Sequence, residues 1–68
     1  MVLNYTLPTE GQCTQFVCIW RVKNNLWCDT YKIVNGKYAY YDITEDDWLT
    51  EVVYPWENPK VKECGYVV

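Results

Sequence analysis

Two short turn signals divide the middle of this chain into segments with the length and composition of β-strands. Asn35-Gly36 is the strongest short signal for a two-residue hairpin turn, because both residue types tolerate the positive φ that a type I′ turn requires. Asn24-Asn25 is a weaker signal of the same kind. The runs beside these turns are rich in β-branched and aromatic residues, which favour strands. We therefore expect a three-stranded β-meander over residues 14–43, with strands at 14–23, 26–34 and 37–43.

Side chains alternate between the two faces of each expected strand. With two-residue turns, Phe16 is expected opposite Ile33 in the first hairpin, and Ile33 opposite Tyr38 in the second. One face then carries most of the aromatic rings, and its residues are Phe16, Cys18, Trp20, Val22, Trp27, Asp29, Tyr31, Ile33, Tyr38, Tyr40 and Asp42. All four bases of the meander fall on the opposite face, so we expect the aromatic face to be buried.

An acidic segment follows the meander and has the pattern of a short amphipathic helix. Thr44 is a suitable N-cap, with Asp47 three residues later. Apolar side chains at 48, 49, 52 and 53 would share one stripe of that helix. We predict a helix over residues 45–53 that covers the aromatic face, a rigid connector at 54–59, and further strands at 2–7 and 60–68. The expected fold class is α+β: a single domain, residues 1–68, whose small antiparallel sheet of four to five strands is packed by one helix.

The size and charge of the chain narrow the classes of function. A chain of 68 residues buries only about 60% of its unfolded surface, which leaves little core to hollow into a deep substrate cleft. Because it also has no histidine, we expect no enzyme and no cofactor. A net charge of -3 and a pI near 4.6 disfavour direct binding to nucleic-acid phosphates. Residues 38–59, however, hold six acids and no base, which favours a basic partner surface.

Four cysteines could form the disulfide framework that small secreted domains often use. Their spacing lacks the paired Cys-x2-Cys motifs of zinc ribbons, so we expect no metal site. The strand alternation puts Cys18 and Cys28 on opposite faces of the meander, which argues against a bond between these two. The start of the chain lacks the pattern of a signal peptide, and no apolar run approaches the roughly 20 residues that cross a bilayer. We expect a cytoplasmic protein that binds no membrane.

Candidate partner-binding residues lie in the acidic segment and just after it. Asp47 and Glu51 would be like charges four residues apart on the predicted helix, and the helix dipole does not account for Glu51. Tyr and Trp are enriched at binding hot spots, which favours Tyr54 and Trp56, although Trp56 could equally close the core. The candidate residues are therefore Asp46, Asp47, Glu51, Tyr54 and Trp56.

By its size, acidity and lack of catalytic groups, the chain resembles the small proteins with which phages and mobile elements inhibit host or defence complexes. That resemblance implies a non-enzymatic inhibitor or regulator, located in the host cytoplasm if a phage encodes it. Its acidic helix face would occupy a basic site, such as one that binds nucleic acid, on a larger protein. Complementary acidic and basic faces would also permit the chain to associate with itself as a homo-oligomer.

Other classes of function stay open. One is a secreted, disulfide-stapled structural or toxin-like domain. A second is an enzyme that uses Asp29 and Asp42, which face each other across the second hairpin, because neighbouring carboxylates can raise one pKa. Stacking of single-stranded bases on the aromatic face would need basic residues among the rings, where the sequence has aspartates.

Overall fold

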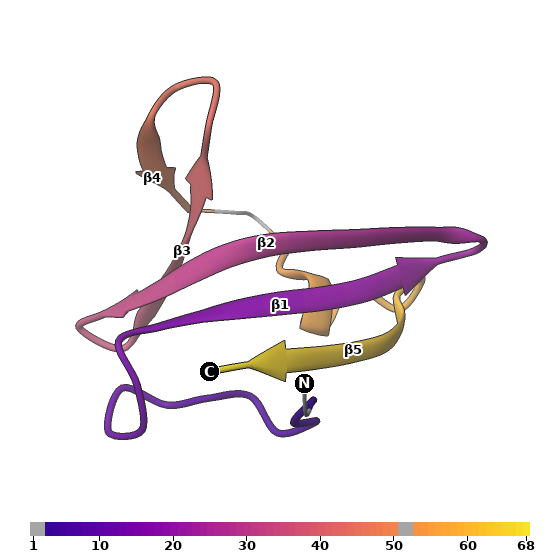
Figure 1. Ribbon diagram of the computed structural model, residues 1–68, viewed down its shortest axis with the longest axis horizontal. Helices are drawn as coiled ribbons and strands as arrows, with labels where there is room; N and C mark the ends of the chain where they lie inside the picture. The colour runs from indigo at the N-terminus through magenta and orange to yellow at the C-terminus, as the bar shows by residue number, and fades with distance from the viewer. Residues whose placement is uncertain (1–2, 51–52) are drawn as a thin grey trace.

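A computed structural model describes residues 3–50 and 53–68 of the chain. Five antiparallel strands form one sheet in the order β4-β3-β2-β1-β5, so the first four strands make a meander and the last returns to pair with the first (Figure 1). A single 3-10 turn, η1, lies on the connection to the last strand. The elements are β1 (Gln15–Val22), β2 (Asn25–Val34), β3 (Lys37–Asp42), β4 (Asp47–Leu49), η1 (Pro55–Glu57) and β5 (Lys62–Val67).

The α+β prediction is wrong, because residues 3–50 and 53–68 contain no α-helix. Thr44 does not cap a helix. Instead, the Asp42 carboxylate accepts hydrogen bonds from the backbone N–H groups of Thr44 at 2.9 Å and Glu45 at 3.1 Å, which closes a turn. Asp side chains compete with helix formation in this way. The chain then reverses, and β4 pairs with β3; residues 51–52 of the predicted helix lie outside the described part of the chain.

The meander itself is confirmed, with one change of register. The second turn is at Asn35-Gly36, where both residues have positive φ, and Ile33 lies opposite Tyr38 as expected. The first turn begins one residue earlier than predicted, at Lys23, whose φ is 56°. Phe16 consequently pairs with Tyr31 instead of Ile33. A register shift of two residues leaves every side chain on its predicted face.

The buried residues confirm that the aromatic face forms the core. Phe16, Cys18, Tyr31 and Ile33 are buried on this face, together with Tyr66 of β5. The predicted helix does not cover them. The connector does, since Tyr54 and Trp56, which flank the buried Pro55, pack against the cluster. The fold therefore closes its core with a 3-10 turn and aromatic rings.

Both ends of the chain depart from the predicted strands. Among residues 3–7, only Asn4 pairs with the sheet: its N–H donates to the Tyr66 carbonyl oxygen at 2.9 Å, and the Tyr66 N–H donates to the Asn4 carbonyl at 2.7 Å. The last strand is shorter than residues 60–68, and its pairing with β1 is irregular between Ile19 and Arg21. Gly65 is buried beside the Leu3 side chain, so the glycine serves close packing.

Candidate functional site

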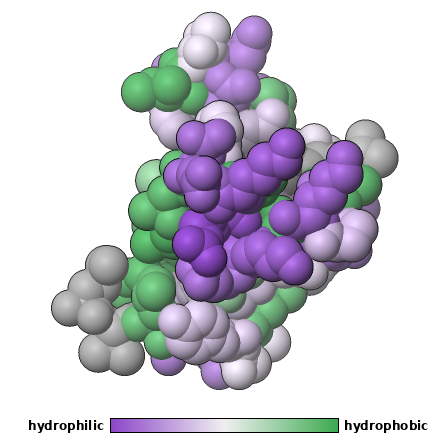
Figure 2. All heavy atoms as spheres, turned by 90° about the vertical axis from the view of Figure 1, so that its right-hand side faces the viewer, coloured by the Kyte–Doolittle hydropathy of each residue, from purple (hydrophilic) through white to green (hydrophobic). Residues whose placement is uncertain are grey.

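The β3–β4 hairpin projects from the rest of the sheet, at the top of Figure 1. Residues 43–46 form its tip, and the Ile43 side chain there is 83% exposed. Glu45 and Asp46 at the tip and Asp47 at the start of β4 are exposed as well. Figure 2 shows the hairpin as a separate lobe at the top, with hydrophobic and hydrophilic atoms side by side. The tip thus places an exposed apolar side chain beside three exposed carboxylates.

Side-chain contacts brace the hairpin from one face. The Tyr41 and Trp48 rings lie opposite each other on β3 and β4 and meet edge to face, with centroids 5.3 Å apart. The Tyr41 hydroxyl donates a hydrogen bond to Oδ1 of Asp46, whose φ is 52°. This hydrogen bond raises the pKa of Tyr41 above its usual value, with smaller contributions from burial and from the charge of Asp42. The ring contact and the hydrogen bond therefore join the tip to the two strands of the hairpin.

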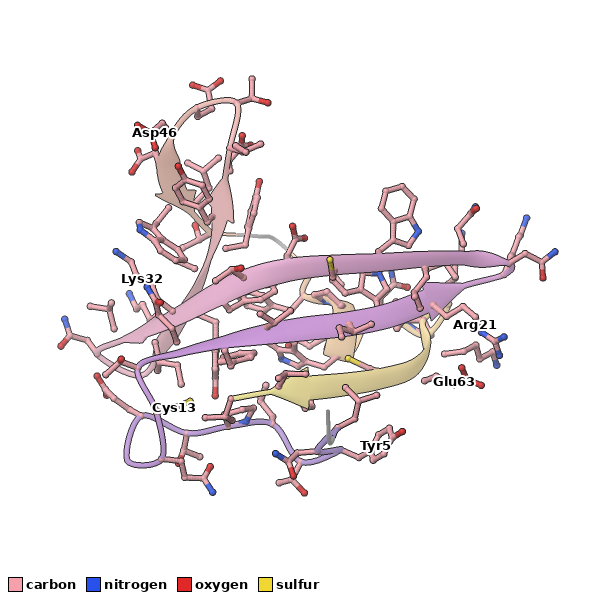
Figure 3. The ribbon with its side chains drawn as sticks, viewed as in Figure 1. Tyr5, Cys13, Arg21, Lys32, Asp46 and Glu63 are labelled. Carbon is pink, nitrogen blue, oxygen red and sulfur yellow. The ribbon has the colours of Figure 1, made fainter. Side chains whose placement is uncertain are left out.

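The hairpin acids form no ion pair within the described residues. The ion pair that those residues contain joins Arg21 to Glu63 at 2.8 Å, and it lies far from Asp46 (Figure 3). Lys32 approaches the hairpin from β2, but its Nζ sits 4.7 Å from the centroid of the Trp48 ring in a cation–π contact. The carboxylates at the tip are thus exposed and have no basic side chain paired with them in the described part of the chain, although Asp46 accepts a hydrogen bond from Tyr41 and Asp47 one from the Trp48 N–H.

A shallow groove of 390 Å³ runs beside β4 on the face opposite the core. Its lining includes the apolar side chains of Val34 and Ala39, the bases Lys32 and Lys37, and Asp47 and Trp48 of β4. The groove shares Asp47 and Trp48 with the hairpin, so the two features form one continuous surface. We call residues 43–47, which are the hairpin tip together with the first residue of β4, the acidic tip.

The structure separates the residues predicted to bind a partner. Asp46 and Asp47 are exposed on the acidic tip, and Glu51 lies outside the described residues. Tyr54 and Trp56 are half-buried and stack on each other at 4.8 Å, and the Tyr54 hydroxyl donates to the Tyr38 carbonyl oxygen at 2.7 Å. Tyr54 and Trp56 therefore pack over the aromatic face and help to cover the core.

Two features of the hairpin were not predicted from the sequence. Ile43 was expected inside the third strand, and the role of Asp42 as a turn former was missed. The signal was present: Asp42 precedes Thr44 by two residues, which is the spacing of an Asx turn, between two runs that suit strands. The contact between the Cys18 and Cys64 sulfurs, 3.4 Å apart, had no local signal, because it depends on β5 returning to β1.

The pKa of the Asp29 carboxyl group is raised above its usual value. Burial is the larger cause, and the negative charge of Asp42 adds to it. The folded protein therefore holds a proton on Asp29 over a pH range, starting near 3.8, in which the unfolded chain has lost it. Stability contributed by this proton is present at low pH and is lost as pH rises through the raised pKa.

Asp29→Asn is expected to be more stable than the wild type at pH 7, with the difference shrinking as pH falls toward 4. Urea unfolding at several pH values measures this difference. Asp47→Asn, on the exposed acidic tip, serves as the control. A constant difference between Asp29→Asn and the wild type across the pH range would contradict the raised pKa.

The described residues do not gather three or more cysteine, aspartate or glutamate side chains in a group that could hold a metal ion. In the same part of the chain, no helix is long and apolar enough to cross a membrane. Asp29 and Asp42 influence each other electrostatically, but neither of them lines the groove beside β4.

No protein-family model, curated protein or solved structure matches this chain.

Proposed function

We propose that this protein is a small, non-enzymatic binding module that inhibits or regulates a larger protein by docking its acidic tip into a basic site. The observation that carries the proposal is the 83% exposed Ile43 on a projecting hairpin whose neighbouring acids, Glu45, Asp46 and Asp47, are exposed and form no ion pair within the described residues. Occupancy of the basic site by the hairpin would exclude that site's usual ligand.

The chemistry of the acidic tip supports a protein partner. Ile43 supplies an apolar anchor, and the surrounding carboxylates supply a charged rim that attracts a basic surface over distance. The brace between Tyr41 and Trp48 reduces the ordering that binding would otherwise require. We therefore still assign partner binding to the acidic segment, although it forms a turn and not a helix. Tyr54 and Trp56 pack against the core instead.

A cytoplasmic location belongs to the same proposal. Cys28 carries an exposed thiol on β2, and exposed thiols are more typical of reducing compartments than of secreted domains. A phage or mobile-element inhibitor of a host or defence complex would act there, and a nucleic-acid-binding site is one basic surface that such an inhibitor could occupy.

Affinity capture with matched variants tests the proposal. The immobilised wild type is compared with Glu45→Lys/Asp47→Lys, which reverses two charges on the tip and keeps the hydrogen bond from Tyr41 to Asp46. The control is Glu10→Lys/Glu63→Lys, which changes the net charge equally on exposed residues outside the hairpin. It also breaks the exposed Arg21–Glu63 ion pair and the hydrogen bond from the Asn35 N–H to Glu10, so circular dichroism first checks that it is folded. A partner that the wild type and control retain and the tip variant loses supports the proposal. A partner that all three retain equally contradicts it.

A further inference from the structure

Cys18 and Cys64 bring their sulfur atoms to 3.4 Å although they are 46 positions apart in the sequence. Cys18 lies on β1 and Cys64 on the neighbouring edge strand β5. The pairing of Cys18 with Tyr66, and the irregularity after Ile19, put both sulfurs on the core side of the sheet. This is a contact between two adjacent strands near the centre of the molecule.

The geometry brings these two cysteines together and keeps the other two apart. Cys28 is exposed on β2, on the opposite face from Cys18. Cys13 precedes β1 and is close enough to Tyr38 that its charge raises the pKa of that tyrosine, after the larger effect of burial. A disulfide has an S–S distance of about 2.05 Å, so the sulfurs of Cys18 and Cys64 need to approach by only about 1.4 Å.

The two thiols differ in access to solvent. Cys18 is 0% exposed, whereas Cys64 is half-buried and its Sγ donates to the Tyr66 hydroxyl oxygen at 3.7 Å. A small disulfide molecule in solution can therefore reach Cys64 first. Cys18 is then the neighbouring thiol that can resolve the mixed disulfide.

We propose that Cys18 and Cys64 form a reversible intramolecular disulfide by exchange with a low-molecular-weight disulfide such as oxidised glutathione. Cys64 loses its proton, and its thiolate attacks one sulfur of the small disulfide, forming a mixed disulfide and releasing one thiolate. Cys18 then loses its proton, and its thiolate attacks the Cys64 sulfur and releases the second thiolate. Two protons leave the protein, its two thiols are oxidised to one disulfide, and the small disulfide is reduced to two thiols.

The disulfide links the edge strand β5 to its neighbour β1. Without it, β5 is held by its pairing with β1 and by the packing of Tyr66 in the core. With it, the unfolded chain is constrained by a long closed loop, which raises the stability of the folded state. Neither cysteine lies on the β3–β4 hairpin, so this proposal is independent of the proposed function.

The full chain is incubated with oxidised glutathione, denatured, alkylated with N-ethylmaleimide and weighed intact. Cys18 and Cys64 are expected to lose both thiols to one disulfide, which peptide mapping should show as a joined pair about 2 Da lighter than the two reduced peptides, while Cys13 and Cys28 carry N-ethylmaleimide or glutathione. The melting temperature is expected to rise by roughly 10 °C or more. Cys13→Ser/Cys28→Ser, which keeps the pair, should show the same loss of thiols and the same shift.

Cys64→Ser is expected to form no intramolecular bond under these conditions and to stop at glutathione adducts. Because substitution of the buried Cys18 could unfold the chain, the decisive variant is Cys13→Ser/Cys28→Ser. Retention of both thiols in that variant, or peptides that join Cys13 or Cys28 in the wild type, would overturn the proposal.

Discussion

Replacing Phe16 with alanine is expected to lower the free energy of unfolding by about 3–5 kcal/mol. The Phe16 side chain is 2% exposed, and its ring stacks on Tyr31 at 5.6 Å and meets Tyr38 at 5.9 Å, Trp56 at 6.3 Å and Tyr66 at 5.8 Å. These contacts join the sheet to the connector that covers it. A domain of this size has a total stability of about 3–10 kcal/mol, so the variant is expected to lose roughly a third of its stability or more.

Urea unfolding followed by circular dichroism measures the loss. Phe16→Leu keeps most of the apolar volume and is expected to lose less. Leu26→Ala, at a position 71% exposed on β2, is expected to stay within about 0.5 kcal/mol of the wild type. If Phe16→Ala were as stable as Leu26→Ala, the aromatic face would not be the core.

Reversing two charges on the acidic tip is expected to slow association with a captured basic partner by about 10- to 100-fold at low salt. Glu45→Lys/Asp47→Lys replaces attraction by repulsion at the exposed surface that would meet the partner first. Dissociation should change less than association, because charges at the rim of an interface act mainly during the encounter. Surface plasmon resonance on the partner measures both rates.

Varying the salt concentration distinguishes electrostatic attraction by the tip from damage to the fold. Raising the salt concentration should slow association of the wild type and shrink its advantage over the tip variant, because salt screens exposed charges. The Glu10→Lys/Glu63→Lys control, with the same net charge as the tip variant, should bind faster than that variant at every salt concentration. Equal rates for the two variants would show that overall charge, and not the tip, attracts the partner.

The meander could be predicted because its turns are specified locally. Asn35-Gly36 fixes the second hairpin through the positive φ of both residues. The first hairpin turns at Lys23-Asn24 instead of Asn24-Asn25, and this register sets Trp20 opposite Trp27 and Phe16 opposite Tyr31. In this register the Phe16 and Tyr31 rings stack at 5.6 Å, and cross-strand aromatic pairs of this kind stabilise a sheet. The prediction of which side chains share a face was still correct, because the register shifted by two residues.

The region after the meander could not be predicted from its hydrophobic pattern. A few apolar residues over a short segment fit a helix and a strand nearly equally well. The choice depends on the Asp42 carboxylate, which caps a turn, and on Tyr41, whose ring meets Trp48 across the hairpin. The acidic residues were found as a candidate site, but their presentation on a projecting tip depends on these contacts. The approach of Cys64 to Cys18 requires the long return of β5 to β1.

The most direct test of this account is the nuclear Overhauser effect between the α-protons of Tyr41 and Trp48 in the full chain. These residues face each other in β3 and β4 at a position between the hydrogen-bonded pairs, where α-protons of antiparallel strands come closest. The hairpin predicts a strong cross-peak between them. Sequential amide–amide contacts over residues 45–50 with no such cross-peak would indicate a helix there and would contradict the acidic tip.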